Sequence, residues 1–236
     1  MSILRRAPRT ALLGAALLAA ALHLTGCSSE ESTAKDPNTA ATPASESPAG
    51  ETVTCEYPAD GTEASRPVEA PAVEASLEEP TQATVLTSVG DFAVTLTPES
   101  APCTVHNFAS LAEQGWFDQT QCHRLTTQGI FVLQCGDPTA TGTGGPGYTI
   151  PDELSGSEVY SAGTLAMANT GMADTGGSQF FVVYADTELP PSYTVFGTLD
   201  AAGIAVLEGV ASKGTVDGGP DGSPAEPVTI TSVSFD

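Results

Sequence analysis

Arg124 is the residue whose type and position in this chain most favour chemistry. The chain has seven lysine and arginine residues against 29 acidic ones, and after Thr81 only Arg124 and Lys213 are basic. Arg124 lies in the stretch Cys122 to Gly136, between two runs of β-forming residues. A surface arginine that pairs with one of many carboxylates contributes little to stability. The isolated guanidinium therefore favours a positioned donor that binds or polarises a substrate.

The cysteines are the second group of reactive side chains. Besides Cys27, the chain contains Cys55, Cys103, Cys122 and Cys135. An even number of cysteines in an exported chain suggests disulfides, in one of three pairings. A four-cysteine zinc site is the alternative, but no Cys-X-X-Cys spacing supports it, and we predict no metal and no cofactor.

A bond between Cys122 and Cys135 is tempting, because the two cysteines flank a predicted hairpin. If Arg124 and Gln134 face each other across that hairpin, regular alternation places the two cysteines on opposite faces of the sheet. We therefore do not expect this pairing, unless the long turn of the hairpin shifts the register.

Residues 1–26 resemble a targeting segment. Three arginines in the first nine residues precede an apolar run, 11–22, that is too short for a membrane span. The sequence Leu24-Thr25-Gly26-Cys27 resembles the lipobox of bacterial lipoproteins, in which the cysteine is lipidated; a plain secretory signal is the alternative. Two or more acyl chains on Cys27 would anchor the protein stably, so we expect an extracytoplasmic, membrane-anchored protein.

The charge of the chain excludes one large class of partners. The formal net charge is −22, and no cluster of basic residues interrupts the acidic surface after the targeting segment. Binding to nucleic acid needs lysines and arginines that neutralise phosphates, so we predict no nucleic-acid partner. Self-repulsion between acidic copies favours a soluble monomer.

The segment 27–82 is predicted to be a disordered tether. It is dominated by Ser, Thr, Ala, Pro and Glu and shows no sustained apolar period. One piece, Val53 to Pro58, contains a cysteine and a tyrosine and predicts a spot that docks on the following domain. An unstructured tail with a free thiol is the alternative reading of this piece.

Residues 83–236 are predicted to form the folded domain. Alternating or apolar runs predict short strands, and two segments have helical periodicity. The predicted strands lie at 82–89, 91–96, on both sides of the turn after Arg124, and at 161–168, 179–184, 194–199 and 228–235, with helices at 102–114 and 201–211. About eight strands and two helices, without βαβ alternation, favour an all-β fold, a closed antiparallel barrel.

From about Val85 to Asp236 the chain resembles the cyclophilin family of peptidyl-prolyl cis/trans isomerases. The resemblance depends on the order and spacing of short motifs, each weak alone. These are Ala101-Pro102, Asn107-Phe108, Cys122-His123-Arg124, Gln134-Cys135-Gly136-Asp137, Gly142-Thr143-Gly144-Gly145, Met167-Ala168-Asn169, Gly177-Ser178-Gln179-Phe180-Phe181 and Val195-Phe196-Gly197. The family implies a closed eight-stranded antiparallel barrel capped by two α-helices, with the active groove on its outer surface.

The resemblance also assigns roles to single residues. Arg124 falls on the catalytic arginine of the family, and Gln134 on the glutamine that helps to fix the substrate backbone. Phe131 and Phe181 fall on the two phenylalanines of the proline pocket. The other predicted substrate-binding residues are Val132, Ala168, Asn169, Gln179, Leu189 and Tyr193. The turn after Arg124 is two residues longer than in well-known eukaryotic members, which could alter the groove edge.

The resemblance implies an isomerase that acts on X–Pro bonds of exported polypeptides and assists their folding outside the cytoplasm. The reaction moves no proton and needs no cofactor, so His123 is expected to be structural. The alternative is a surface lipoprotein that binds proline-containing peptides without required turnover.

Overall fold

The computed structural model describes residues 50–235. The predicted targeting segment 1–26, the predicted lipidation site Cys27 and the first part of the predicted tether lie outside the described residues.

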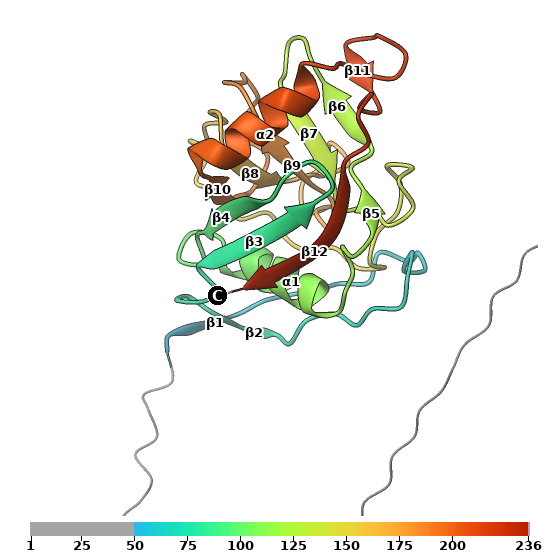
Figure 1. The fold of residues 1–236 in the computed structure, drawn as a ribbon. Coiled ribbons are helices and arrows are strands. Elements are labelled where there is room, and N and C mark those ends of the chain that lie inside the picture. Colours follow the sequence, from blue (N-terminus) through green and yellow to red (C-terminus); the bar gives the residue numbers. More distant parts are fainter. Residues whose placement is uncertain (1–49, 236) are drawn as a thin grey trace, which may run out of the picture. The chain divides into compact units, whose positions relative to one another are not determined.

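The described part is built on one antiparallel sheet of ten strands (Figure 1). The strands are β3 (Gln82–Thr87), β4 (Phe92–Leu96), β5 (Thr120–Gln121), β6 (Arg124–Thr126), β7 (Val132–Cys135), β8 (Thr164–Met167), β9 (Phe180–Val183), β10 (Val195–Leu199), β11 (Asp221–Gly222) and β12 (Thr229–Phe235). Their order is β11-β6-β7-β9-β8-β10-β4-β3-β12-β5. In β4, buried Phe92, Val94 and Leu96 alternate with exposed residues, so one face of the strand forms the core.

The predicted all-β antiparallel fold with two helices is confirmed, but the predicted closed eight-stranded barrel is not. The sheet has ten strands, and its order begins with β11 and ends with β5. The two additional strands are β5 and β11, which pairs with β6; β5 is separate because the chain changes partner at Cys122 and His123. β5 pairs with β12 before this point, whereas β6 pairs with β7 after it. A run that reads as one strand in the sequence therefore forms two.

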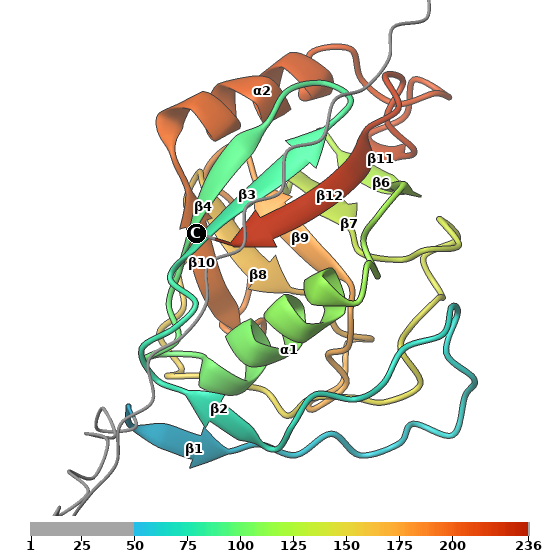
Figure 2. The ribbon, with the colours of Figure 1, turned by 60° about the horizontal axis from the view of Figure 1, so that its bottom comes forward.

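The two helices lie at opposite ends of the curled sheet (Figures 1 and 2). Helix α1 (Pro102–Glu113) begins with proline, and the amides of Cys103 and Thr104 donate to the carboxylate of Glu153 at 2.9 and 2.8 Å. Helix α2 (Ala201–Ala211) is capped by Asp200, which accepts from the amide of Gly203. Among the described residues, no helix is long and apolar enough to span a membrane.

The core lies between the sheet and the two helices, and it includes Leu207 and Val210 of α2. Its largest fully buried side chains are aromatic: Phe108 of α1 packs against Phe117, Phe180 and Phe196 with ring centroids 5.1 to 5.6 Å apart. Trp116 is fully buried, and its indole N–H donates to the carbonyl of Gly136 at 3.1 Å. This bond ties the end of α1 to the segment that follows β7.

The prediction of a disordered tether up to residue 82 is wrong for the described residues of that segment. Residues 50–81, here called the strap, run along α1 and carry the paired strands β1 (Thr52–Thr54) and β2 (Glu74–Ser76) (Figure 2). The guanidinium of Arg66 donates to the carbonyls of Gly115, Trp116 and Asp118 at 2.9 to 3.1 Å. These cross-links order a segment whose composition alone could not bury enough apolar surface.

The predicted docking spot at Val53 to Pro58 is confirmed. Cys55 is buried and forms a disulfide with Cys103 of α1, with the Cα atoms 5.5 Å apart. The ring of Tyr57 meets that of Tyr148 edge-on at 5.8 Å. The strap is therefore joined to the domain both covalently and by packing.

We expect the double variant Cys55→Ala, Cys103→Ala to lower the free energy of unfolding by about 2–4 kcal/mol, measured by urea denaturation. The Cys55–Cys103 bond joins residues that are 48 positions apart in the sequence. The second disulfide, Cys122–Cys135, joins residues that are 13 positions apart. Loop-closure entropy makes the longer loop worth about 1 kcal/mol more than the shorter one. The variant Cys122→Ala, Cys135→Ala is the comparison, and an equal or greater loss in it would contradict the prediction.

The expectation that Cys122 and Cys135 do not pair is wrong. Arg124 pairs with Gln134 as predicted, but the amide of His123 also donates to the carbonyl of Gln134, at 3.0 Å. Two residues of one strand thus oppose one residue of the other, and this β-bulge shifts the register by one. Cys122 then lies opposite Cys135, with the Cα atoms 4.0 Å apart, and the two form a disulfide. Because each of the four cysteines is bonded to another, the zinc alternative is also wrong.

Candidate active site

The candidate site contains one row of residues that crosses four neighbouring strands. The register pairs Arg124 of β6 with Gln134 of β7, Gln134 with Phe181 of β9, and Phe181 with Ala166 of β8. Paired residues of adjacent strands project from the same face of a sheet, here the face away from the aromatic core. The sheet thus places a cation, an amide and an aromatic ring side by side, although they are far apart in the sequence.

The guanidinium of Arg124 is held by two neighbours. Asp221 accepts from Nε at 2.8 Å and from Nη2 at 2.7 Å, while the Gln134 side-chain oxygen accepts from Nη1 at 3.3 Å. Three of the five N–H groups are used, so two remain for a ligand. The hydrogen bonds and charge of Asp221 raise the pKa of Arg124 despite its partial burial. The group is therefore a permanent cation with a fixed orientation.

Asp221 was not predicted as a site residue. It lies on β11, which pairs with β6, and no motif in its surroundings marks it in the sequence. Its carboxyl pKa is lowered, mainly by the hydrogen bond from Arg124. Only the pairing of β11 with β6 brings it to the arginine.

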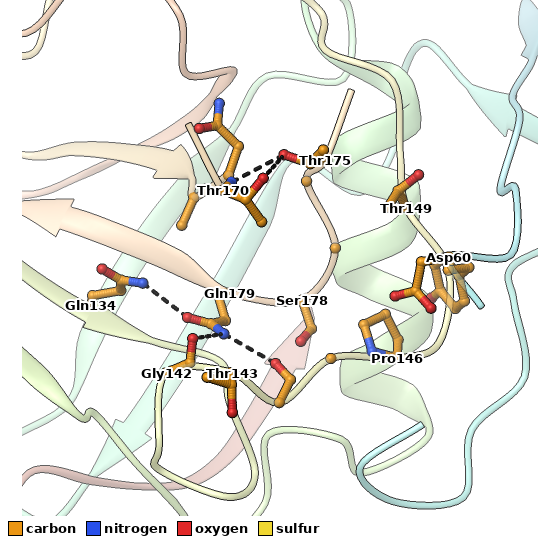
Figure 3. Close-up of a pocket in the computed structure, with 17 residues that line it drawn as sticks. Asp60, Gln134, Gly142, Thr143, Pro146, Thr149, Thr170, Thr175, Ser178 and Gln179 are labelled. Carbon is orange, nitrogen blue, oxygen red and sulfur yellow. Dashed lines mark hydrogen bonds between the residues drawn. The ribbon is translucent and has the colours of Figure 1, made fainter. Parts of the chain in front are cut away.

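A chain of side-chain amides runs from Gln134 toward the glycine-rich loop, residues 137–148 (Figure 3). The amide of Gln134 donates to the side-chain oxygen of Gln179 at 2.9 Å, and that of Gln179 donates to the carbonyls of Gly142 and Gly144, each at 3.0 Å. These bonds fix the rotamers of both glutamines. A polar edge of defined geometry therefore runs along the row.

The loop is organised by Asp137, which is fully buried. Its carboxylate accepts from the amides of Thr139, Thr141, Gly142 and Gly144 at 2.7 to 3.1 Å. Burial by itself would raise the pKa of Asp137, but these hydrogen bonds outweigh it and hold the pKa below its ordinary value. The loop that supports Gln179 is thus built around a buried charge.

An apolar cluster lies on the other side of the row. Phe181 is buried and meets Tyr193 edge-on at 5.4 Å. Val132, Tyr160, Ala168 and Leu189 belong to the same cluster, which is separate from the main core. The structure therefore brings together Phe181, Val132, Leu189 and Tyr193 as predicted, next to Gln134 and Arg124.

Phe131 does not join this cluster, contrary to the prediction. Its ring packs against the main core and against Tyr184, at 5.9 Å, while Ile130 contacts the outer cluster instead. The reason is the alternation of side chains along a strand. Because Val132 and Gln134 face outward, Phe131 faces inward and Ile130 faces outward. This alternation was readable in the sequence and would have identified Ile130.

Asn169 is held between two loops and follows Ala168, a member of the apolar cluster. Its side-chain amide donates to the carbonyl of Ser192 at 2.8 Å, and its side-chain oxygen accepts from the amide of Gly171 at 3.0 Å. The amide of the preceding residue, Ala168, donates to the carbonyl of Gln179 at 2.9 Å. Ala168, Asn169 and Gln179 thus lie together as predicted.

His123 fits the expected structural role. Burial is the largest influence on the imidazole pKa of His123 and lowers it. The ring is therefore neutral at physiological pH. Neither ring nitrogen has a hydrogen-bond partner among the described residues. Since no described hydroxyl or thiol lies within hydrogen-bond distance of the ring, it has no nucleophile to deprotonate.

The whole arrangement can bind an extended chain and polarise an amide. It offers a fixed cation, side-chain amides with defined rotamers, and an apolar cluster beside them. None of these groups forms a nucleophile–base pair, so the chemistry it suits is electrostatic and needs no covalent intermediate.

Comparisons with known proteins agree with this geometry. The family model described as "Cyclophilin type peptidyl-prolyl cis-trans isomerase/CLD" matches residues 83–235. The probable peptidyl-prolyl cis-trans isomerase B of Mycobacterium tuberculosis (strain H37Rv) is 46% identical over 197 residues, 77% of this chain and 64% of the relative. The peptidyl-prolyl cis-trans isomerase B of Bacillus subtilis (strain 168) is 50% identical over 104 residues, 43% of this chain and 71% of the relative.

Solved structures show the same fold. The crystal structure of a cyclophilin-type peptidyl-prolyl cis-trans isomerase from Cryptosporidium parvum matches with a TM-score of 0.58 at 28% identity, over 66% of this chain and 97% of that chain. A second crystal structure of that protein, obtained in the presence of the dipeptide Ala-Pro, matches with a TM-score of 0.57 at 28% identity, over 66% of this chain and 98% of that one. This chain spans 64% of the length of the mycobacterial relative, just under two thirds.

Proposed function

The chain belongs to the family of cyclophilin-type peptidyl-prolyl cis-trans isomerases, and we propose that it catalyses the cis/trans isomerisation of X–Pro bonds in exported polypeptides. The observation that carries this proposal is the row of Arg124, Gln134 and Phe181 on one face of the sheet. It supplies a cation, an amide and an aromatic ring at neighbouring positions, as rotation about a prolyl amide requires.

Rotation about an X–Pro bond is slow because the amide is conjugated. The barrier is about 18–20 kcal/mol, and the uncatalysed reaction takes tens to hundreds of seconds. As the bond twists, the lone pair of the prolyl nitrogen leaves conjugation and becomes an acceptor. A guanidinium N–H of Arg124 directed at this nitrogen stabilises the twisted state more than either planar state, which lowers the barrier.

The remaining groups hold the substrate while the bond turns. In this proposal the proline ring packs on the apolar cluster of Phe181, Val132, Leu189 and Tyr193. The side chains of Gln134 and Asn169, whose positions are set by hydrogen bonds, can pair with the polar backbone beside the proline. Fixing one side of the bond while the other side turns lowers the entropy cost of reaching the twisted state.

Exchange spectroscopy on a proline-containing peptide tests the proposed activity. Catalysis broadens or exchanges the cis and trans signals at catalytic amounts of protein. The alternative function, a binding module for proline-containing segments, predicts chemical-shift changes at stoichiometric amounts without faster exchange. These two results separate an isomerase from a binding protein.

The extracytoplasmic location is part of the proposal and depends on two observations. Residues 24–27 resemble a lipobox, and two disulfides suit an oxidising compartment. Together they support a membrane-anchored isomerase whose clients are proline-containing exported polypeptides. The formal net charge of −22 is the ground for expecting no nucleic-acid partner.

We expect metabolic labelling with a fatty acid to tag the wild-type protein, and Cys27→Ala to abolish the label and release the protein from the membrane. The reason is that two or more acyl chains are needed for stable anchoring, and Cys27 is their predicted attachment site. The neighbouring substitution Ser28→Ala is the control and should keep the label. An unlabelled wild-type protein would contradict the lipobox interpretation.

A further inference from the structure

A cavity of about 360 Å³ lies at the polar end of the groove (Figure 3). It shares Gln134, Ala168, Asn169 and Gln179 with the candidate site and extends between the glycine-rich loop and the loop that follows Asn169. Its volume falls in the range of about 300–1,000 Å³ that binding pockets for small molecules occupy. A long side chain of a polypeptide bound across the row can therefore enter it.

One wall of this cavity comes from the strap, outside the part of the chain that matches the family model. The strap residue Ala59 forms an isolated β-bridge with Tyr148. The amide of Asp60 donates to the carbonyl of Gly147 at 3.2 Å, and that of Thr149 donates to the carbonyl of Pro58 at 2.9 Å. These bonds hold Asp60 against the loop that lines the cavity.

Asp60 is the only charged residue that lines the cavity among the residues described. Its Oδ1 atom accepts from the amide and the hydroxyl of Thr62, both at 2.7 Å, whereas Oδ2 makes no hydrogen bond within the described chain. In the view of Figure 3, Asp60 and Gln134 lie on opposite sides of the cavity. One carboxylate oxygen thus stays free at the end of the cavity that is remote from the arginine.

The other lining groups are uncharged and rich in oxygen. They include the hydroxyls of Thr143, Thr149, Thr170 and Thr175 and the carbonyls of the glycine-rich loop. Such walls accept hydrogen bonds from the N–H groups of a lysine or arginine side chain, and a carboxylate pairs with its charge. An acidic side chain entering the same space would meet the charge of Asp60 without a cation to offset it.

We propose that this cavity binds a positively charged side chain of the polypeptide substrate, on a residue flanking the X–Pro bond, and that Asp60 determines this preference. The proposal rests on the proposed function, because it assumes a polypeptide bound across Arg124, Gln134 and Phe181. It assigns the strap a role in substrate selection in addition to its contacts with α1.

Binding of fluorescent proline peptides to the full-length chain tests the proposal without reference to turnover. The peptides carry arginine, or its uncharged isostere citrulline, at each position flanking the X–Pro bond. At one of these positions we expect the arginine peptide to bind about fivefold more tightly at low salt, the upper end of what exposed ion pairs contribute. The preference should shrink as salt is added, since salt screens the pair.

Asp60→Asn is the critical variant. Asparagine keeps the side-chain oxygen that Thr62 contacts and removes only the charge, so the arginine preference should disappear while the citrulline peptides bind as before. Glu63→Gln is the matched control: it makes the same change in charge on an exposed strap residue that does not line the cavity, and should keep the preference.

Two outcomes would overturn the proposal. One is equal binding of arginine and citrulline peptides at every flanking position. The other is an equal loss of preference in Asp60→Asn and Glu63→Gln, which would show that only the net charge of the protein matters. If the peptides bind with the expected preference but show no faster exchange, the proposed isomerase activity fails and the cavity assignment stands.

Discussion

Arg124→Ala is expected to lower kcat/KM for X–Pro isomerisation by tenfold or more, a loss of transition-state stabilisation of at least about 1.4 kcal/mol. Arg124 carries the cation of the site, and among the residues described the other basic ones, Arg66 and Lys213, are engaged elsewhere. Its partner Asp221 is exposed, so water can solvate that carboxylate in the variant and the fold should be kept. The measurement is exchange spectroscopy on a proline peptide.

Lys213→Ala is the matched control for the loss of a positive charge. Lys213 pairs with Glu226 at the surface and should leave kcat/KM unchanged when removed. Arg124→Lys should fail substantially as well, because an ammonium cannot bind Asp221 through two parallel N–H groups and contact Gln134 at the same time. Near-wild-type turnover in a folded Arg124→Ala protein would rule out the proposed mechanism.

Gly144→Ala is expected to lower the free energy of unfolding by about 3–5 kcal/mol, the cost of leaving a buried charge poorly paired. A Cβ atom at residue 144 would lie 2.8 Å from Cγ of Asp137 and 2.8 Å from Oγ of Ser65. Either the loop or the buried carboxylate must then move, and Asp137 loses donors. Urea denaturation measures the loss.

The same substitution should lower kcat/KM, because Gln179 donates to the carbonyls of Gly142 and Gly144 and in turn holds Gln134. Gly145→Ala is the control one residue away, where a Cβ would meet no atom within 4 Å. Its stability and activity should match the wild type. If the two variants behave alike, the buried carboxylate of Asp137 does not organise the loop.

Local patterns in the sequence were sufficient to predict the strands of the site and the pairing of Arg124 with Gln134. Apolar alternation defines strands wherever one face is buried, and the turn between Arg124 and Gln134 joins two such strands. The order of short motifs also indicated the family, and the match of the family model over residues 83–235 confirms it. The family resemblance assigns Phe131 to the proline-binding residues, but the alternation of side chains along the strand turns Phe131 to the main core and Ile130 to the outer cluster.

Other features depended on contacts that no local pattern contains. The bulge at His123 shifts the register by one residue, and only the hydrogen bond to Gln134 reveals it. The strap reads as disordered because its composition is polar; Cys103 and the carbonyls that Arg66 contacts lie about 50 residues further along the chain. Order in the strap therefore comes from its partners.

The sequence by itself thus determined which side chains could do the chemistry, since residue type and strand period are local properties. Tertiary structure decided how they are held. Asp221 reaches Arg124 across a separation of 97 residues, and Asp60 reaches the cavity through a bridge to Tyr148. Such placements are set by which strands and loops pack together, and the free energy of that packing is spread over the whole domain.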